Sequence, residues 1–139
     1  MLKIYKTNTV GEIEKLKKIE PNSWINLSNP NPDEIKEVIE KTKIPESLIL
    51  KVLDYEELPR IETEDKSTLI VVDVPYVEDK KSKNKYSTVP VGIITKGNYF
   101  LTICLKETEI FNDFKHNKIK DVDTAKKTRF IIQLLLKIA

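Results

Sequence analysis

The sequence predicts an α/β (α+β) fold, specifically a three-layer α/β/α sandwich with a central mixed, largely antiparallel sheet. Three apolar runs, at residues 69–74, 89–95 and 99–105, indicate strands that are covered on both faces. A polar loop at residues 79–85 and a tight turn at residues 96–98 connect these runs as a meander. Helical patterns come in pairs before and after the meander, so one pair can cover each face of the sheet.

The first part of the chain contains short elements. Leu2 and Ile4 alternate with lysines, which indicates an edge strand. Ile13, Leu16 and Ile19 have the spacing of a short helix. Residues 24–27 then predict a second short strand.

The first helix pair has clear boundary signals. Asn31 can cap the first helix, Pro32 suits its first position, and Glu34 can complete a capping box. A second helix is predicted to begin at Glu46, and residues 60–65 are expected to be extended because Pro59 breaks the helix. The predicted core faces of the two helices consist of Ile35, Val38, Ile39, Leu48, Ile49, Val52 and Leu53.

Two helices are predicted after the meander. Thr108 can cap the first, whose apolar side chains include Phe111 and Phe114. Asp123 or Thr124 is expected to cap the last helix.

The last helix, predicted over residues 124–139, is apolar on nearly every face of its second half. It has no terminating Gly, Asn or Pro, and it leaves Leu136 and Ile138 in need of a cover. We therefore expect residues 1–139 to be a single soluble domain of a longer protein. The helix at 124–139 would begin a segment that leads away from the domain.

Composition excludes several classes of protein. A length of 139 residues suits one domain, and 24 basic against 22 acidic side chains give no argument for nucleic acid. A single cysteine, Cys104, excludes an internal disulfide framework. The N-terminus is not a signal peptide, and the longest apolar stretch, residues 130–136, is too short to span a bilayer.

Catalytic groups are sparse, and we do not expect an enzyme. His116 is the only histidine and sits among polar residues, so a surface position is expected. Cys104 lies within an apolar strand and is expected in the core. Spacing alone leaves a Cys–His pair open. An enzyme acting on a small molecule would need a deep pocket that gathers Cys104, His116 and a carboxylate.

Carboxylates are the remaining candidates for chemistry, because magnesium prefers their oxygens. They gather in three places, at Asp54, Glu56, Glu57, Glu62, Glu64 and Asp65, at Glu78 and Asp79, and at Asp121 and Asp123. Their spacing matches no calcium-binding loop, and a solvated acidic surface balanced by Arg60 and Lys66 is the favoured interpretation of the first group.

Two further charged features have both a structural and a functional interpretation. The lysine-rich segment at residues 80–85 is expected to keep a loop in water, with a phosphate or lipid headgroup contact as the alternative. Asp73, within an apolar strand, is expected to pair with a basic residue or to reach water at a strand end, with an inter-subunit contact as the alternative.

Several segments, taken in order, resemble the N-terminal cytoplasmic domain of the CorA-type magnesium/cobalt transporter family. The likeness covers nearly the whole chain, and residues 59–62 (Pro-Arg-Ile-Glu) with their flanking helix and strand are its most specific part. The other matching segments are residues 24–30, 44–46, 53–54, 69–76, 89–94, 99–105 and 126–129.

The resemblance implies a homopentamer that carries magnesium, and often cobalt, into the cell. It places this domain at the cytoplasmic face of the cell membrane, with a stalk helix, two membrane helices and a Gly-Met-Asn signature outside this chain. It also implies a regulatory magnesium ion between neighbouring domains, and Glu78 and Asp79 approximately match that site. The partner carboxylate would lie on the stalk, so we expect weak or no magnesium binding by the isolated fragment.

The expected partners are therefore divalent cations and other copies of the chain. No nucleic acid partner is expected, and contact with the membrane is expected only through the missing C-terminal part. Magnesium would neutralise facing carboxylates and hold the assembly closed, a coupling of about 1–3 kcal/mol per effector. The alternative in another class is a free-standing interaction domain that pairs through its apolar C-terminal helix. A related subtype, such as a zinc exporter, remains open within the transporter class.

Overall fold

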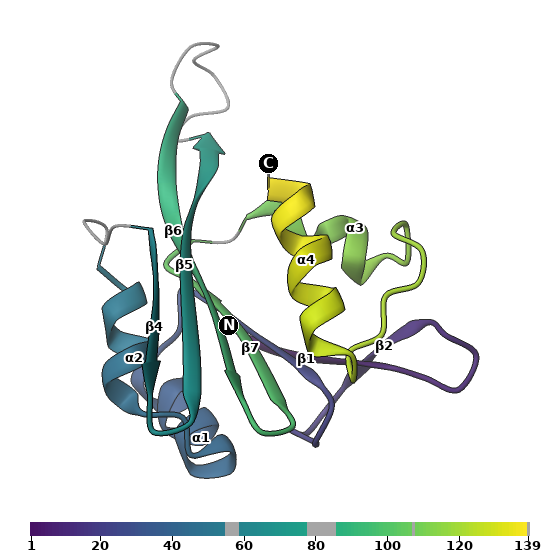
Figure 1. Ribbon diagram of the computed structural model, residues 1–139, viewed down its shortest axis with the longest axis horizontal. Coiled ribbons are helices and arrows are strands. Elements are labelled where there is room, and N and C mark those ends of the chain that lie inside the picture. Colours follow the sequence, from purple (N-terminus) through teal and green to yellow (C-terminus); the bar gives the residue numbers. More distant parts are fainter. Residues whose placement is uncertain (55–58, 78–85, 107, 139) are drawn as a thin grey trace.

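The computed structural model describes residues 1–54, 59–77, 86–106 and 108–138 (Figure 1). Its centre is a seven-stranded sheet with the strand order β2-β1-β3-β7-β6-β5-β4. Among the strands of the described residues, only β3 and β7 pair in parallel, so the sheet is mixed and largely antiparallel, as predicted. The strands are β1 (Leu2–Thr7), β2 (Ile13–Leu16), β3 (Trp24–Ser28), β4 (Arg60–Glu64), β5 (Ser67–Val77), β6 (Tyr86–Lys96) and β7 (Tyr99–Cys104).

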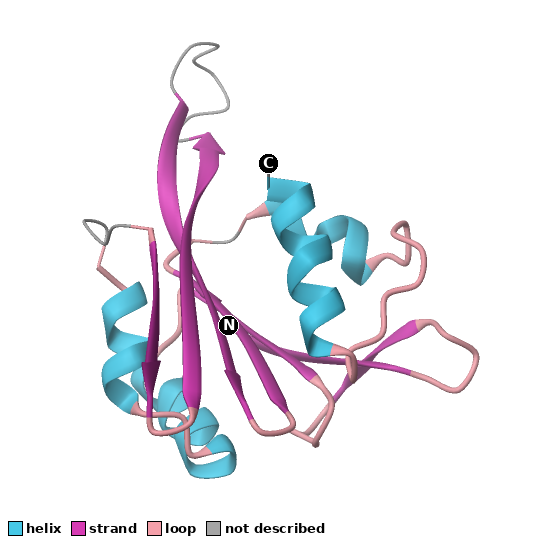
Figure 2. Cartoon of the chain, viewed as in Figure 1, coloured by secondary structure: helices cyan, strands magenta, loops and turns pink. Residues whose placement is uncertain are grey.

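Helices cover both faces of the sheet, which confirms the predicted three-layer arrangement (Figures 1 and 2). One layer contains α1 (Pro32–Thr42) and α2 (Glu46–Val52). The other contains the short 3₁₀ helix η1 (Glu109–Phe111), α3 (Asn112–Lys115) and α4 (Lys127–Ile138). Each layer has its own apolar cluster against the sheet.

The core under α4 is built around aromatic side chains. Phe130 of α4 contacts Trp24, Phe100 and Phe114, with ring centroids 4.8–5.6 Å apart. The edge-to-face angles of 62–74° suit the charge distribution of aromatic rings. The indole Nε1 of Trp24 donates to the hydroxyl of Thr102 at 2.8 Å, and that hydroxyl donates to Oδ1 of Asn26 at 2.9 Å. These buried polar groups therefore join β3 to β7.

The core on the other side depends on a close approach of α2 to β6. The side chain of Val52 packs over Gly92, where a Cβ atom would lie 2.4 Å from Cγ2 of Val52. Gly92 thus lets the helix sit closer to the sheet than any larger residue would allow.

Two predictions for the first twenty residues are wrong. Residues 13–16 form β2 and not a helix, because they pair antiparallel with β1 and satisfy its outer backbone groups. A helix of so few residues is also costly to nucleate. β1 is consequently an inner strand between β2 and β3, and the edge position belongs to β2. The side chain of Asn8 reverses the chain between β1 and β2 by accepting from the backbone N–H groups of Val10 and Glu12.

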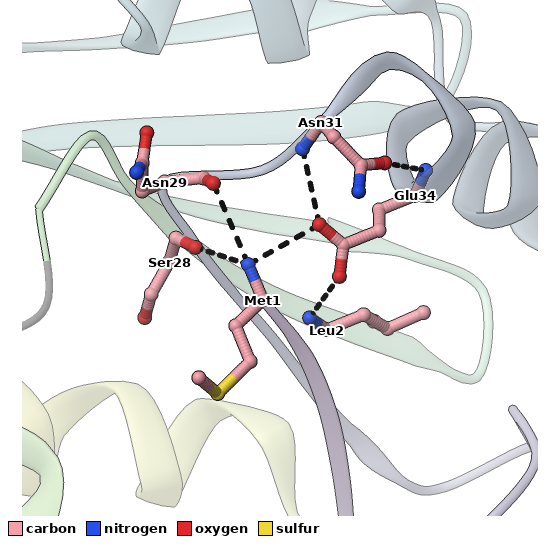
Figure 3. A network of polar contacts seen from close by, with 6 residues as sticks. All are labelled: Met1, Leu2, Ser28, Asn29, Asn31 and Glu34. Atoms are coloured by element: carbon pink, nitrogen blue, oxygen red, sulfur yellow. Dashed lines mark hydrogen bonds and ion pairs between the residues drawn. The ribbon is translucent and has the colours of Figure 1, made fainter.

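The predicted capping box of α1 is confirmed and joins a larger network (Figure 3). The amide oxygen of Asn31 accepts from the backbone N–H of Glu34 at 2.8 Å, and the Glu34 carboxylate accepts from Asn31 N–H at 3.0 Å. The same carboxylate accepts from the Leu2 N–H and lies 3.2 Å from the terminal ammonium of Met1, which also donates to the Ser28 carbonyl. Glu34 therefore ties α1 to the ends of β1 and β3.

Burial would raise the pKa of Glu34, but this network outweighs that effect. Hydrogen bonds from the Asn31 backbone, the terminal ammonium and the Leu2 backbone lower the pKa of the carboxyl below its ordinary value.

The remaining turns and helices largely follow the predictions. Gly97 has a positive φ of 55° in the two-residue turn between β6 and β7, as expected. Thr108 accepts from the backbone N–H of Ile110, but the helix it starts is a 3₁₀ turn followed by the short α3. The last helix begins at Lys127 and not at residue 124, because Thr124 exchanges two hydrogen bonds with Thr7 of β1.

Candidate functional site

The candidate metal ligands Glu78 and Asp79 lie outside the described residues, as does the lysine-rich segment at residues 80–85. The described part of β5 ends at Val77, directly before them, and β6 begins at Tyr86. These ends of β5 and β6 project beyond the helices (Figure 1).

The carboxylates around β4 are engaged with basic and hydroxyl groups. Glu62 lies 2.8 Å from Nε of Arg60 and 3.0 Å from Nζ of Lys51, and hydrogen bonds from these two side chains lower its pKa. Glu64 accepts a hydrogen bond from the Ser47 hydroxyl at 3.0 Å. Asp65 lies 3.4 Å from Nζ of Lys96, and Asp54 is exposed. Glu56 and Glu57 lie outside the described residues.

The aspartates before α4 take part in hydrogen bonds of the segment that leads into this helix. Oδ1 of Asp123 accepts from the backbone N–H of Ala125 at 2.9 Å, and the carbonyl of Asp121 accepts from the guanidinium of Arg129. Within the described parts of the chain, no group of three or more His, Cys, Asp or Glu is placed to hold a metal ion.

The sparse catalytic candidates take the predicted positions. His116 is exposed at the end of α3, and Cys104 is buried at the end of β7. Burial raises the pKa of the Cys104 thiol, against hydrogen bonds from the Lys106 and Leu105 backbones. A hollow of about 640 Å³ lies on the β1–β2 hairpin, lined by Lys6, Thr7, Asn8, Thr9, Val10, Glu14 and Leu16, and therefore by neither candidate.

Asp73 is exposed although its strand is largely apolar. It lies opposite Pro90 in the β5–β6 register. The charge therefore reaches water, as one of the two structural interpretations predicted, although Asp73 lies within β5 and not at a strand end.

The outer face of α4 is an apolar surface. Phe130 and Leu134 are buried against the sheet, whereas Ile132 and Leu136 are 52% and 71% exposed. These two exposed residues are four positions apart and so lie on the same face of the helix. Ile138 is partly buried against the core, unlike the expectation that it would be uncovered. The position of α4 is fixed in part by an ion pair between Lys137 and Asp113 at 2.6 Å.

The sequence interpretation missed a concentration of positive charge around β2 and α3. The overall charge of +2 hides it, since the basic residues come from two segments far apart in the chain. Charge counted segment by segment would have revealed it.

Comparisons with known proteins agree with this architecture. A family model described as "CorA-like Mg2+ transporter protein" matches residues 20–139. The complete CorA magnesium transporter of Methanocaldococcus jannaschii is similar over 99% of this chain and 44% of its own, with a TM-score of 0.80 and 21% identity. The soluble domain of that CorA is similar over 97% of this chain and 55% of its own, with a TM-score of 0.76 and 24% identity.

A third solved structure, the ZntB cytoplasmic domain of Vibrio parahaemolyticus, is similar over 98% of this chain and 56% of its own. Its TM-score is 0.74 and its identity is 12%. None of the curated proteins matches the chain. The chain therefore spans about half the length of the solved structures it resembles. No helix among the described residues is long and apolar enough to cross a bilayer.

Proposed function

The chain belongs to the CorA-like Mg2+ transporter protein family, and we propose that it is the cytoplasmic regulatory and assembly domain of a divalent-cation transporter. The observation that carries the proposal is the family match over residues 20–139, which extends from β3 to the end of α4. The similarity of the whole sheet and both helix layers to the CorA soluble domain supports it.

The proposed sensor consists of Glu78 and Asp79, directly after β5. Magnesium would bind there between neighbouring subunits, with retained water and carboxylate oxygens as its ligands. The described ends of β5 and β6 project beyond the helices, and Glu78 and Asp79 follow Val77 directly in the sequence, which supports this assignment (Figure 1).

The proposed mechanism couples this ion to the arrangement of subunits. At high cytosolic magnesium, the ion neutralises facing carboxylates and favours the closed assembly. When magnesium falls, the carboxylates repel one another and the subunits shift. A coupling of about 1–3 kcal/mol requires only that the closed state binds the ion about 5–150 times more tightly.

The proposed assembly is a homopentamer at the cytoplasmic face of the cell membrane. We propose that α4 leads into a stalk and that membrane-spanning helices follow it. The exposed pair Ile132 and Leu136 supports this, since apolar side chains on one helix face gain stability when a neighbouring helix covers them. Such a transporter domain would have no enzymatic activity of its own.

Limited proteolysis of the membrane-embedded parent protein tests the sensor. Magnesium should slow cleavage, and the double variant Glu78→Gln/Asp79→Asn should lose that protection. The variant Asp33→Asn/Glu37→Gln, which changes two exposed carboxylates of α1, is the matched control and should keep it. Equal protection in both variants would show that magnesium acts elsewhere. A parent gene without membrane-spanning segments would refute the transporter assignment itself.

A second candidate function is an interaction module that pairs through the outer face of α4. The exposure of Ile132 and Leu136 favours it. Sedimentation velocity of residues 1–139 decides between the two: a tight dimer that dissociates in Ile132→Lys/Leu136→Lys supports the module. A monomer at all concentrations contradicts it. The substitutions should change the free energy of unfolding by no more than about 0.5 kcal/mol, because both side chains are on the surface.

A further inference from the structure

Charge is distributed unevenly along this chain. Residues 1–19 contain five lysines and two glutamates, and residues 112–129 contain six lysines or arginines and three aspartates. Together these two segments have a formal charge of +6, whereas the rest of the chain has −4. Such asymmetry is typical of proteins that bind an anionic surface.

The fold joins the two basic segments through hydrogen bonds between residues more than 100 positions apart in the sequence. The backbone N–H and hydroxyl of Thr7 bond to Thr124 and to the Val122 carbonyl at 3.1–3.2 Å. The side-chain amide of Asn117 bonds to both backbone groups of Ile13, at 2.7 Å to the N–H and 3.3 Å to the carbonyl. Both segments therefore lie at the β2 end of the sheet, on the right in Figure 1.

Lysines gather where these segments meet. Lys15 is exposed and lies directly opposite Tyr5 in the β1–β2 register, and Nζ of Lys115 is 5.6 Å from the centre of the Tyr5 ring. Lys118 is exposed beside Asn117. Further exposed cationic or titratable residues of the two segments are Lys17, Lys18, His116, Lys120, Lys126 and Arg129. We call the group Lys15, Lys115 and Lys118 the basic end.

The two segments contain more basic than acidic side chains, so their formal charge stays positive. The carboxylate of Asp113 is paired with Lys137 at 2.6 Å, and that of Glu14 accepts from the side chain of Asn8. Glu12 is exposed at the start of β2.

The residue types at the basic end select among anionic partners. Lysine is a compact, strongly hydrated charge on a flexible stem, and it is depleted in specific protein interfaces. Single-stranded nucleic acid needs aromatic platforms, but Tyr5 is only 7% exposed. A fluid layer of anionic headgroups needs neither fixed geometry nor stacking, so mobile lysines suit it best.

We propose that the basic end contacts anionic lipid headgroups of the membrane. The proposal rests on the proposed function, because a transporter subunit holds this domain beside a bilayer. The contact is electrostatic, so it weakens as salt shortens the Debye length. Each lysine near an anionic bilayer strengthens binding about fivefold.

Flotation of residues 1–139 with vesicles, in the absence of magnesium, tests the contact. Binding is expected with vesicles of mixed phosphatidylcholine and phosphatidylglycerol, and not with phosphatidylcholine alone. The variant Lys15→Gln/Lys118→Gln should bind about 25-fold more weakly, at about fivefold per lysine. The matched control Lys36→Gln/Lys41→Gln removes two exposed lysines from α1, in the opposite helix layer, and should bind as the wild type does.

Three results would overturn the proposal. The first is the absence of flotation with anionic vesicles. The second is an equal loss of binding in both double variants, since then no specific end of the molecule contacts lipid. The third is self-association without vesicles that the Lys15→Gln/Lys118→Gln variant abolishes, because the basic end would then bind a second copy. Circular dichroism confirms that each variant is folded. The assay needs no magnesium and no pore, so its failure is distinguishable from failure of the transporter assignment.

Discussion

The contact between Gly92 and Val52 makes the packing of α2 directly testable. A methyl group at residue 92 would lie 2.4 Å and 2.9 Å from the two Cγ atoms of Val52, and 3.0 Å from Cγ2 of Ile103. These separations are shorter than carbon atoms tolerate, so Gly92→Ala requires α2 to move away from the sheet. Overpacking of this kind costs about 1–3 kcal/mol. The same substitution offsets about 0.4–1 kcal/mol of this cost, because alanine has less conformational freedom than glycine in the unfolded chain.

The partner substitution turns this cost into a double-mutant cycle. Val52→Ala removes two fully buried methyl groups, which at about 0.8 kcal/mol each costs about 1.6 kcal/mol before any cavity forms. In the double variant, the methyl group introduced at residue 92 enters the space that the Val52 side chain vacates. We therefore expect the double variant to be more stable than the sum of the single changes predicts, by about 1–3 kcal/mol.

Urea denaturation followed by tryptophan fluorescence measures all four proteins, and an unchanged slope with denaturant confirms that the same transition is compared. Gly97→Ala is the matched control, because residue 97 has open space around it and a positive φ of 55°. It should cost about 1 kcal/mol through backbone strain and show no coupling to Val52→Ala. Additive effects of Gly92→Ala and Val52→Ala would refute the packing argument.

Two further predictions concern polar groups. Glu34→Gln should lower the free energy of unfolding by about 1–2 kcal/mol at pH 7, since it weakens the capping box and the bonds to β1. Because the folded-state pKa of Glu34 is lowered, its contribution is present above the unfolded-state pKa and disappears as pH falls through the folded-state value. The difference in free energy of unfolding between Glu34→Gln and the wild type should therefore be large at pH 7 and small at pH 3. An equal difference at both pH values would contradict this role of the Glu34 carboxylate. Thr102→Val should cost about 1–3 kcal/mol, since it leaves the buried Trp24 N–H without its acceptor. Equal stability of Thr102→Val and wild type in guanidinium denaturation would show that this hydrogen bond contributes nothing.

Local signals in the sequence were sufficient for much of the fold. Asn31, Pro32 and Glu34 act within one helical turn, so their pattern predicted the start of α1 correctly. The meander of β5, β6 and β7 followed from long apolar runs and a glycine turn. The prediction failed where strand pairing overrode the local pattern of apolar residues, as in β2, whose conformation depends on its pairing with β1.

In the candidate site too, the features set by neighbouring residues were predicted, whereas those that depend on the fold were not. His116 and Cys104 were placed correctly from their neighbours in the sequence, because burial of a single side chain follows the local apolar pattern. The basic end was missed because its lysines come from both ends of the domain. Glu78 and Asp79 remain a prediction that rests on the resemblance.

The parallel pair of β3 and β7 has a consequence for biosynthesis. Asn26 meets Thr102, 76 positions later, so β3 leaves the ribosome well before its partner exists. Until the meander is made, β3 has an unpaired side that an incomplete neighbouring copy can join. Slow synthesis of the intervening region would lengthen that exposure, and binding by a chaperone during this interval would prevent aggregation of the nascent chains.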